Sequence, residues 1–144
     1  MTRLERLDPA VKHADKKEQA ALKQVAAAQS EVNIEQNKLS QLKDYRDEYI
    51  NRRDRMQASH SVIELQEFNR FLSQLDDTIK KQMSVIKLRQ SQLDEQRSQW
   101  LKTQINSKVI HQVVKNLSQE EIVKQARSEQ KAMDEFSLRK SQNR

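Results

Sequence analysis

The chain contains no glycine at all, and its single proline is Pro9. Glycine supplies the positive-φ conformations that most tight turns require, so a chain of 144 residues without it has few turns to make. Charged residues make up 33% of the chain and hydrophobic residues only 35%. Such a composition is typical of a disordered chain, or of long helices with a narrow apolar stripe. It argues against a sandwich, a barrel or a doubly wound sheet.

The missing residue types also exclude several kinds of chemistry. Without glycine there is no glycine-rich loop to hold a nucleotide phosphate. Without cysteine there is no disulfide, no thiol nucleophile and no cysteine-ligated zinc. The three histidines, His13, His60 and His111, do not have the spacing of metal ligands. We therefore expect no catalytic residue, no cofactor and no metal site.

The distribution of charge and apolar residues bears on location and partners. The net charge is +6, and residues 1–60, 61–108 and 109–144 each carry +2. Nucleic-acid-binding proteins usually concentrate positive charge on one face or tail, so we expect no nucleic-acid partner. No apolar run approaches the ~18 residues of a membrane span, and no signal-peptide core follows Met1. We expect a cytoplasmic protein with no direct membrane insertion.

Two amphipathic helices are predicted from the 3/4 spacing of apolar residues. The first covers about 9–58, beginning at Asp8 as N-cap with Pro9 in the first turn. The second covers about 62–136, because Ser61 and Glu64 form an S-x-x-E capping box after a turn at about 59–61. A polar tail follows at 137–144. Four polar residues interrupt the apolar frame of the first helix: Glu18, Glu35, Arg46 and Arg53.

A short connection between two long amphipathic helices predicts an antiparallel coiled-coil hairpin, all-α and a single domain over 1–144. If the chain reverses near residue 59, facing residues have numbers adding to about 117, which pairs Leu42 with Leu75 and Tyr49 with Phe68. On the same arithmetic the second helix extends past its partner. We therefore expect an overhanging C-terminal helix over 109–136.

Aromatic residues gather at one level of this hairpin. We expect one apolar strip, open to solvent along its edge, made of Leu42, Tyr45, Tyr49, Phe71 and Leu75. One interpretation is that the rings only broaden the seam between the helices. The other is a docking surface, because tyrosine and phenylalanine are enriched at interfaces and exposed apolar patches usually serve one.

The motifs in and around this strip resemble those of a known family. Residues 42–49 resemble the L-x-x-Y-x-x-E-Y signature of the flagellar export protein FliJ, and residues 65–75 resemble the second signature of that family. Trp100 stands where the family often has its tryptophan, and residues 133–136 resemble its C-terminal M-D-E-F-like motif. The resemblance covers essentially the whole chain.

The resemblance implies a non-catalytic component of the flagellar type III export apparatus, peripherally associated with the cytoplasmic face of the inner membrane. The implied partners are the ring of the export ATPase FliI, the cytoplasmic part of the export-gate protein FlhA, and export chaperones. The gate-binding surface carried over by position would consist of Lys38, Leu42, Tyr45, Tyr49, Phe71, Leu75, Thr78 and Gln82. A stalk protein of a virulence type III secretion system and a generic coiled-coil adaptor remain alternatives.

Overall fold

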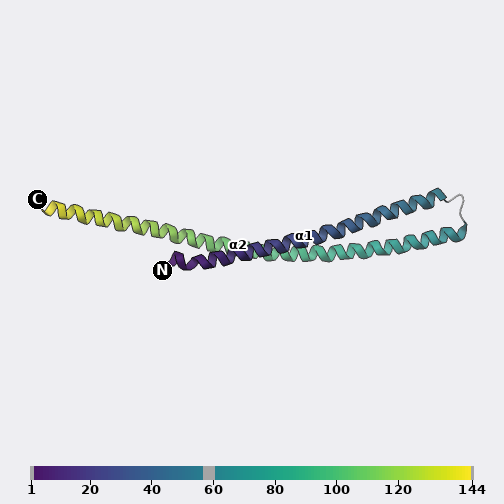
Figure 1. Ribbon diagram of the computed structural model, residues 1–144, viewed down its shortest axis with the longest axis horizontal. Helices are drawn as coiled ribbons and strands as arrows, with labels where there is room; N and C mark the ends of the chain where they lie inside the picture. Colours follow the sequence, from purple (N-terminus) through teal and green to yellow (C-terminus); the bar gives the residue numbers. More distant parts are fainter. Residues whose placement is uncertain (1, 57–60, 144) are drawn as a thin grey trace. The chain divides into compact units, whose positions relative to one another are not determined.

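The computed structural model describes residues 2–56 and 61–143, and these form two long helices (Figure 1). α1 is Arg3–Met56 and α2 is Val62–Gln142. No strand occurs in the two described ranges. The all-α prediction is therefore confirmed. The expected turn at about 59–61 falls partly on residues 57–60, which lie outside the described part of the chain.

α1 begins six residues earlier than the sequence analysis predicted. The backbone N–H of Glu5 donates to the Thr2 hydroxyl at 3.3 Å, and the N–H of Arg6 donates to the Thr2 carbonyl at 3.3 Å. Thr2 is therefore the N-cap, and the prediction of Asp8 was wrong. Asp8 lies inside the helix and forms an ion pair with Lys12 at 3.2 Å.

The start of α2 was predicted correctly, but its end was not. The Ser61 hydroxyl accepts the backbone N–H of Glu64 at 3.3 Å, as an N-cap does. At the other end, the expected polar tail at 137–144 is helical as far as Gln142. Two properties favour this longer helix: no glycine or proline interrupts it, and Arg139 and Lys140 place positive charge in its last turn.

The chain divides into two compact units. One of them is Ala21–Trp100, which we call the inner unit. Its cross-helix contacts pair α1 and α2 in reverse order along the sequence: Gln29 with Arg97, Glu35 with Gln82, Arg46 with Asp76, and Arg53 with Asn69. This order is consistent with a hairpin. The buried apolar residues of this unit are Val32, Leu72, Leu75, Ile79, Ile86 and Leu93.

The polar residues that interrupt the predicted frame of α1 lie in the seam between the helices. Glu35 is buried, whereas Glu18, Arg46 and Arg53 are half-buried. Three of the four bond to α2: Glu35 accepts from Gln82, Arg46 donates to Asp76, and Arg53 donates to Asn69. The frame is therefore confirmed at these positions, and its polar members form cross-helix layers. One apolar member of the predicted frame, Met56 at the end of α1, is not buried in the seam, because it is exposed.

The second unit, which we call the outer unit, comprises Met1–Ala20 and Leu101–Arg144. Ala14 and Ser107 are buried in it, and Asp15 accepts hydrogen bonds from the Ser107 hydroxyl at 3.1 Å and the His111 ring at 2.9 Å. The expected frame of α2 continues here, since Ile110, Val114 and Leu117 are half-buried. Every residue from 119 to 143 is exposed.

Candidate functional site

Four aromatic rings from both helices form one cluster in the inner unit. Tyr49 lies at its centre, with its ring centroid 4.5 Å from that of Phe71 and 4.8 Å from that of Phe68. Tyr45 lies on the edge, 6.1 Å from Phe71 in a T-shaped arrangement and 6.4 Å from Tyr49. These separations are those of favourable aromatic pairs. The predicted pairing of Tyr49 with Phe68 is confirmed.

The cluster combines a packed side and an open side. Tyr49, Phe68 and Phe71 are half-buried and form the packed side. Tyr45 is 46% exposed and forms the open side. Tyr45 and Tyr49 are one turn apart on α1, and Phe68 and Phe71 are three residues apart on α2, so each helix presents two rings to the same edge. Phe68 was not included in the predicted surface. It could have been, because the predicted pairing of the helices puts it opposite Tyr49, which was included.

A shallow groove adjoins the exposed ring of Tyr45. It has a volume of about 300 Å³, and its lining comes from both helices: Lys38, Gln41, Leu42, Tyr45 and Gln82. Four of these five residues belong to the predicted gate-binding set. The fifth, Gln41, was missed, although it lies three residues after Lys38 and four before Tyr45, the spacing of one helix face.

A buried carboxylate, that of Glu35, fixes two of the three polar residues of this groove. The Gln82 amide nitrogen donates to the Glu35 carboxylate at 2.6 Å and to the Glu35 backbone carbonyl at 2.9 Å. Lys38 Nζ donates to the other carboxylate oxygen at 3.2 Å. These bonds, that of Gln82 above all, hold the pKa of Glu35 below its ordinary value, against the opposing effect of desolvation. Glu35 therefore positions Lys38 and Gln82.

The remaining predicted site residues lie in different surroundings. Leu75 is only 7% exposed and belongs to the buried core, so it is not part of an open strip. Thr78 is exposed, and its hydroxyl donates to the Gln74 carbonyl at 3.0 Å within its own helix. The structure therefore brings six of the eight predicted residues together around the groove and the rings. It assigns Leu75 to packing and leaves Thr78 at the surface.

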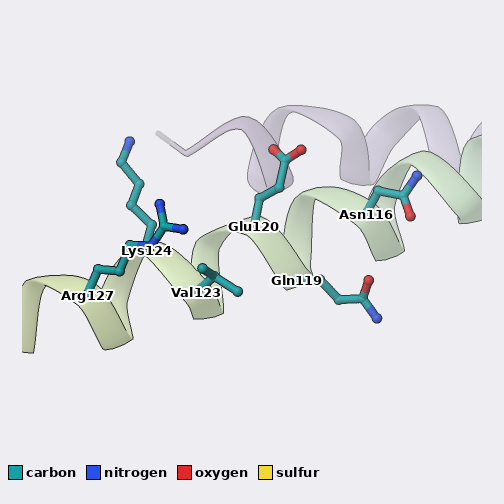
Figure 2. A pocket seen from close by; sticks show the side chains of 6 residues that line it. All are labelled: Asn116, Gln119, Glu120, Val123, Lys124 and Arg127. Carbon is teal, nitrogen blue, oxygen red and sulfur yellow. The ribbon is translucent and has the colours of Figure 1, made fainter. Parts of the chain in front are cut away.

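A second concave region lies on α2 in the outer unit (Figure 2). It has a volume of about 640 Å³, and its lining comes from one helix: Asn116, Gln119, Glu120, Val123, Lys124 and Arg127. All six residues are exposed. Because one helix supplies the whole lining, this region does not enclose a small molecule. The charged groups of Glu120, Lys124 and Arg127 are exposed and available to a partner.

In the ranges 2–56 and 61–143, no group of three or more histidine, aspartate or glutamate side chains is arranged to hold a metal ion. Neither of the two helices, as far as it is described, contains a stretch apolar enough to cross a bilayer.

Comparison with known proteins agrees with the motifs. A family model described as the flagellar FliJ protein matches residues 3–144. The chain belongs to the FliJ family. Comparison with curated proteins and with solved structures gave no match. Membership in the FliJ family connects the chain with flagellar protein export, and the family is a non-enzymatic export component.

Proposed function

We propose that this FliJ-family chain is a non-catalytic export factor that binds the cytoplasmic part of the gate protein FlhA through the groove and the aromatic cluster. The observation that carries the proposal is the exposed ring of Tyr45, which borders both features. A half-exposed aromatic ring beside an oriented lysine and glutamine is the composition of an interface anchor with a polar rim. FliJ family membership supports the flagellar setting over the virulence-secretion and adaptor alternatives.

In this proposal the gate-binding set is the predicted one, Lys38, Leu42, Tyr45, Tyr49, Phe71, Leu75, Thr78 and Gln82, with Gln41 and Phe68 added. Its apolar members supply contact area, and Lys38 and Gln82 supply directional hydrogen bonds. Leu75 contributes from the buried core, and Thr78 contributes an exposed hydroxyl-bearing side chain.

We also propose that the chain acts as a stalk for the ring of the export ATPase FliI and contacts export chaperones. In this proposal it is a long antiparallel coiled-coil hairpin whose C-terminal helix overhangs, and it is cytoplasmic and peripherally associated with the inner membrane. Support comes from the reverse order of the cross-helix contacts and from the exposure of residues 119–143. Hydrogen exchange should then show low protection in that segment of the free protein and higher protection when the ATPase is added.

The gate proposal is tested with Tyr45→Ala and Phe71→Ala, measured for binding to the cytoplasmic part of FlhA. We expect each variant to remain helical, to melt near the wild type and to bind about tenfold more weakly or worse, a loss of about 1.4 kcal/mol. Leu22→Ala is the matched control, because Leu22 is 50% exposed and lies outside the groove. The proposal is wrong if both variants bind like the wild type, or if they melt much earlier while the folded fraction binds normally.

A further inference from the structure

An apolar ridge runs along α2 in the outer unit, and neither the groove nor the aromatic cluster includes any of its residues. Its members are exposed aliphatic residues spaced four apart: Leu101 at 51%, Ile105 at 55%, Val109 at 56% and Val113 at 43% exposure. We call these four residues the outer ridge. Isolated exposed aliphatics are normal, but four in consecutive turns on one helix form a continuous apolar surface.

The outer ridge begins on the side of α2 that faces away from α1. Figure 2 shows Gln119 and Val123 pointing to the side opposite the α1 ribbon. Leu101 precedes Gln119 by eighteen residues, and Ile105 precedes Val123 by the same number. Eighteen residues are five complete helical turns at 3.6 residues per turn, so each pair projects in the same direction. Leu101 and Ile105 are therefore directed away from α1.

On α2, the charges beside the outer ridge have one sign. Between Glu95 and Glu120 the sequence contains no aspartate or glutamate. Within the same stretch, Lys102 and Lys108 are exposed, and each lies three residues from Ile105, so they flank the ridge on the helix surface. On α1 of this unit, Asp15 is bonded to Ser107 and His111, and Asp8 forms an ion pair with Lys12. On α2, the ridge is an apolar surface with a basic border.

We propose that the outer ridge binds an amphipathic helix of a protein partner whose apolar face is bordered by acidic residues. Residues spaced four apart form the ridges that pack into the grooves of a second helix, so the shape fits a helix. Acidic borders would complement Lys102 and Lys108, and they would set the orientation and increase the association rate. The ridge covers about 18 Å of helix axis, which is enough for three turns of the partner.

Two other occupants fit the ridge less well. A second copy of this chain would bring the two Lys108 side chains together, because Lys108 lies near the middle of the ridge, and like charges in an interface are unfavourable. A lipid surface favours helices rich in lysine and arginine on the polar face, with tryptophan, phenylalanine or leucine on the apolar face. Residues 101–113 contain only two lysines, Lys102 and Lys108, and the ridge has no aromatic residue.

The test uses the full-length chain and two synthetic helical peptides of about 18 residues, long enough to form a helix on binding. Both peptides carry leucines at four-residue spacing; one has glutamate at the bordering positions and the other has lysine. We expect the glutamate peptide to bind about tenfold more tightly or better by fluorescence anisotropy, and salt to weaken its binding. Ile105→Gln and Val109→Gln should each weaken binding, and Lys108→Glu should reverse the preference between the peptides.

The control variant is Leu88→Gln, because Leu88 is 57% exposed but lies in the inner unit. It should leave peptide binding unchanged, and circular dichroism should show the same helix content for all variants. Equal affinity for both peptides, equal loss in Leu88→Gln, or unchanged preference in Lys108→Glu would overturn the proposal. So would dimerisation abolished by Ile105→Gln, or tighter binding to vesicles of phosphatidylglycerol and phosphatidylcholine than to the peptide. Because neither the gate nor the ATPase is used, failure here leaves the proposed function standing.

Discussion

Gln82 on α2 donates from one amide nitrogen to both the carboxylate and the backbone carbonyl of Glu35 on α1. Glu35 is only 7% exposed, so this polar pair lies within an otherwise apolar seam. A buried polar pair satisfied in one alignment and separated in others specifies the register between helices. The contact therefore fixes which part of α2 meets the groove residues of α1.

Acidification should weaken the contribution of Glu35 to stability. Its pKa is lowered in the folded protein, chiefly by the Gln82 hydrogen bond, so the contribution is present above the ordinary pKa of the carboxyl. It is lost as the pH falls through the lower, folded value. We expect the wild type to exceed Glu35→Gln in free energy of unfolding at pH 7, and the difference to shrink between about pH 5 and pH 3. Urea denaturation across this range measures it; a constant difference would contradict the prediction.

Ser61, an N-cap, and Asp8, a residue inside α1, should respond differently to substitution by alanine. Ser61→Ala removes the hydroxyl that accepts the Glu64 N–H and should cost about 1 kcal/mol of stability. Asp8→Ala removes only an exposed ion pair with Lys12 inside α1, so it should cost a few tenths of a kcal/mol at about neutral pH. Chemical denaturation of both variants under one condition makes the comparison. A larger loss for Asp8→Ala would mean that the helix begins at Asp8 after all.

Core and edge positions should respond differently to truncation. Leu72 is 7% exposed, and Leu72→Ala should lower the free energy of unfolding by roughly 2–5 kcal/mol, because it deletes buried methyl groups and leaves a cavity. Tyr45→Ala removes a ring that is 46% exposed and should cost clearly less. Thermal and urea unfolding followed by circular dichroism provide the measurement. Equal losses would show that Tyr45 has a packing role comparable to that of Leu72.

Cysteine crosslinking should report the direction of the helices. Tyr49 contacts Phe68, and Glu35 contacts Gln82. Leu42 and Leu75 lie midway between these two contacts, seven residues from each along their own helices. Cysteines at 42 and 75 should therefore form an intramolecular disulfide, whereas cysteines at 42 and 100 should not. Crosslinking mainly at 42 and 100, or only between chains, would refute the antiparallel hairpin.

The seam was predictable from the sequence because heptad spacing is a direct consequence of helix geometry. The polar positions in that frame, such as Glu35 and Arg46, were visible only as interruptions, because their hydrogen-bond partners lie 30 to 47 residues away. The true start of α1 could have been found, since Thr2 and Glu5 also have capping-box spacing. The proline at position 9 drew the prediction to a later start.

The candidate site was predictable in its aromatic part and less so elsewhere. Edge positions at opposing heptad sites bring Tyr45 and Phe71 together without knowledge of the structure. Burial of Leu75, however, depends on how closely the helices approach, and heptad position alone does not give that distance. Gln41 could have been included, because its spacing from Lys38 and Tyr45 is that of one helix face, whereas the bond from Lys38 to Glu35 is seen only in the structure.

Exposure of every residue from 119 to 143 makes the end of α2 a helix supported chiefly by local interactions. One such interaction is the bond from Gln130 to Asp134, at four-residue spacing. Helices of this kind are in equilibrium with the coil, and a partner that binds the helical form has its apparent affinity scaled by the helical fraction. Substitutions that raise helix propensity in this segment would strengthen binding even where the substituted residue makes no contact with the partner. The affinity of this end is thus adjustable through intrinsic folding tendency alone, independently of the residues that make contact.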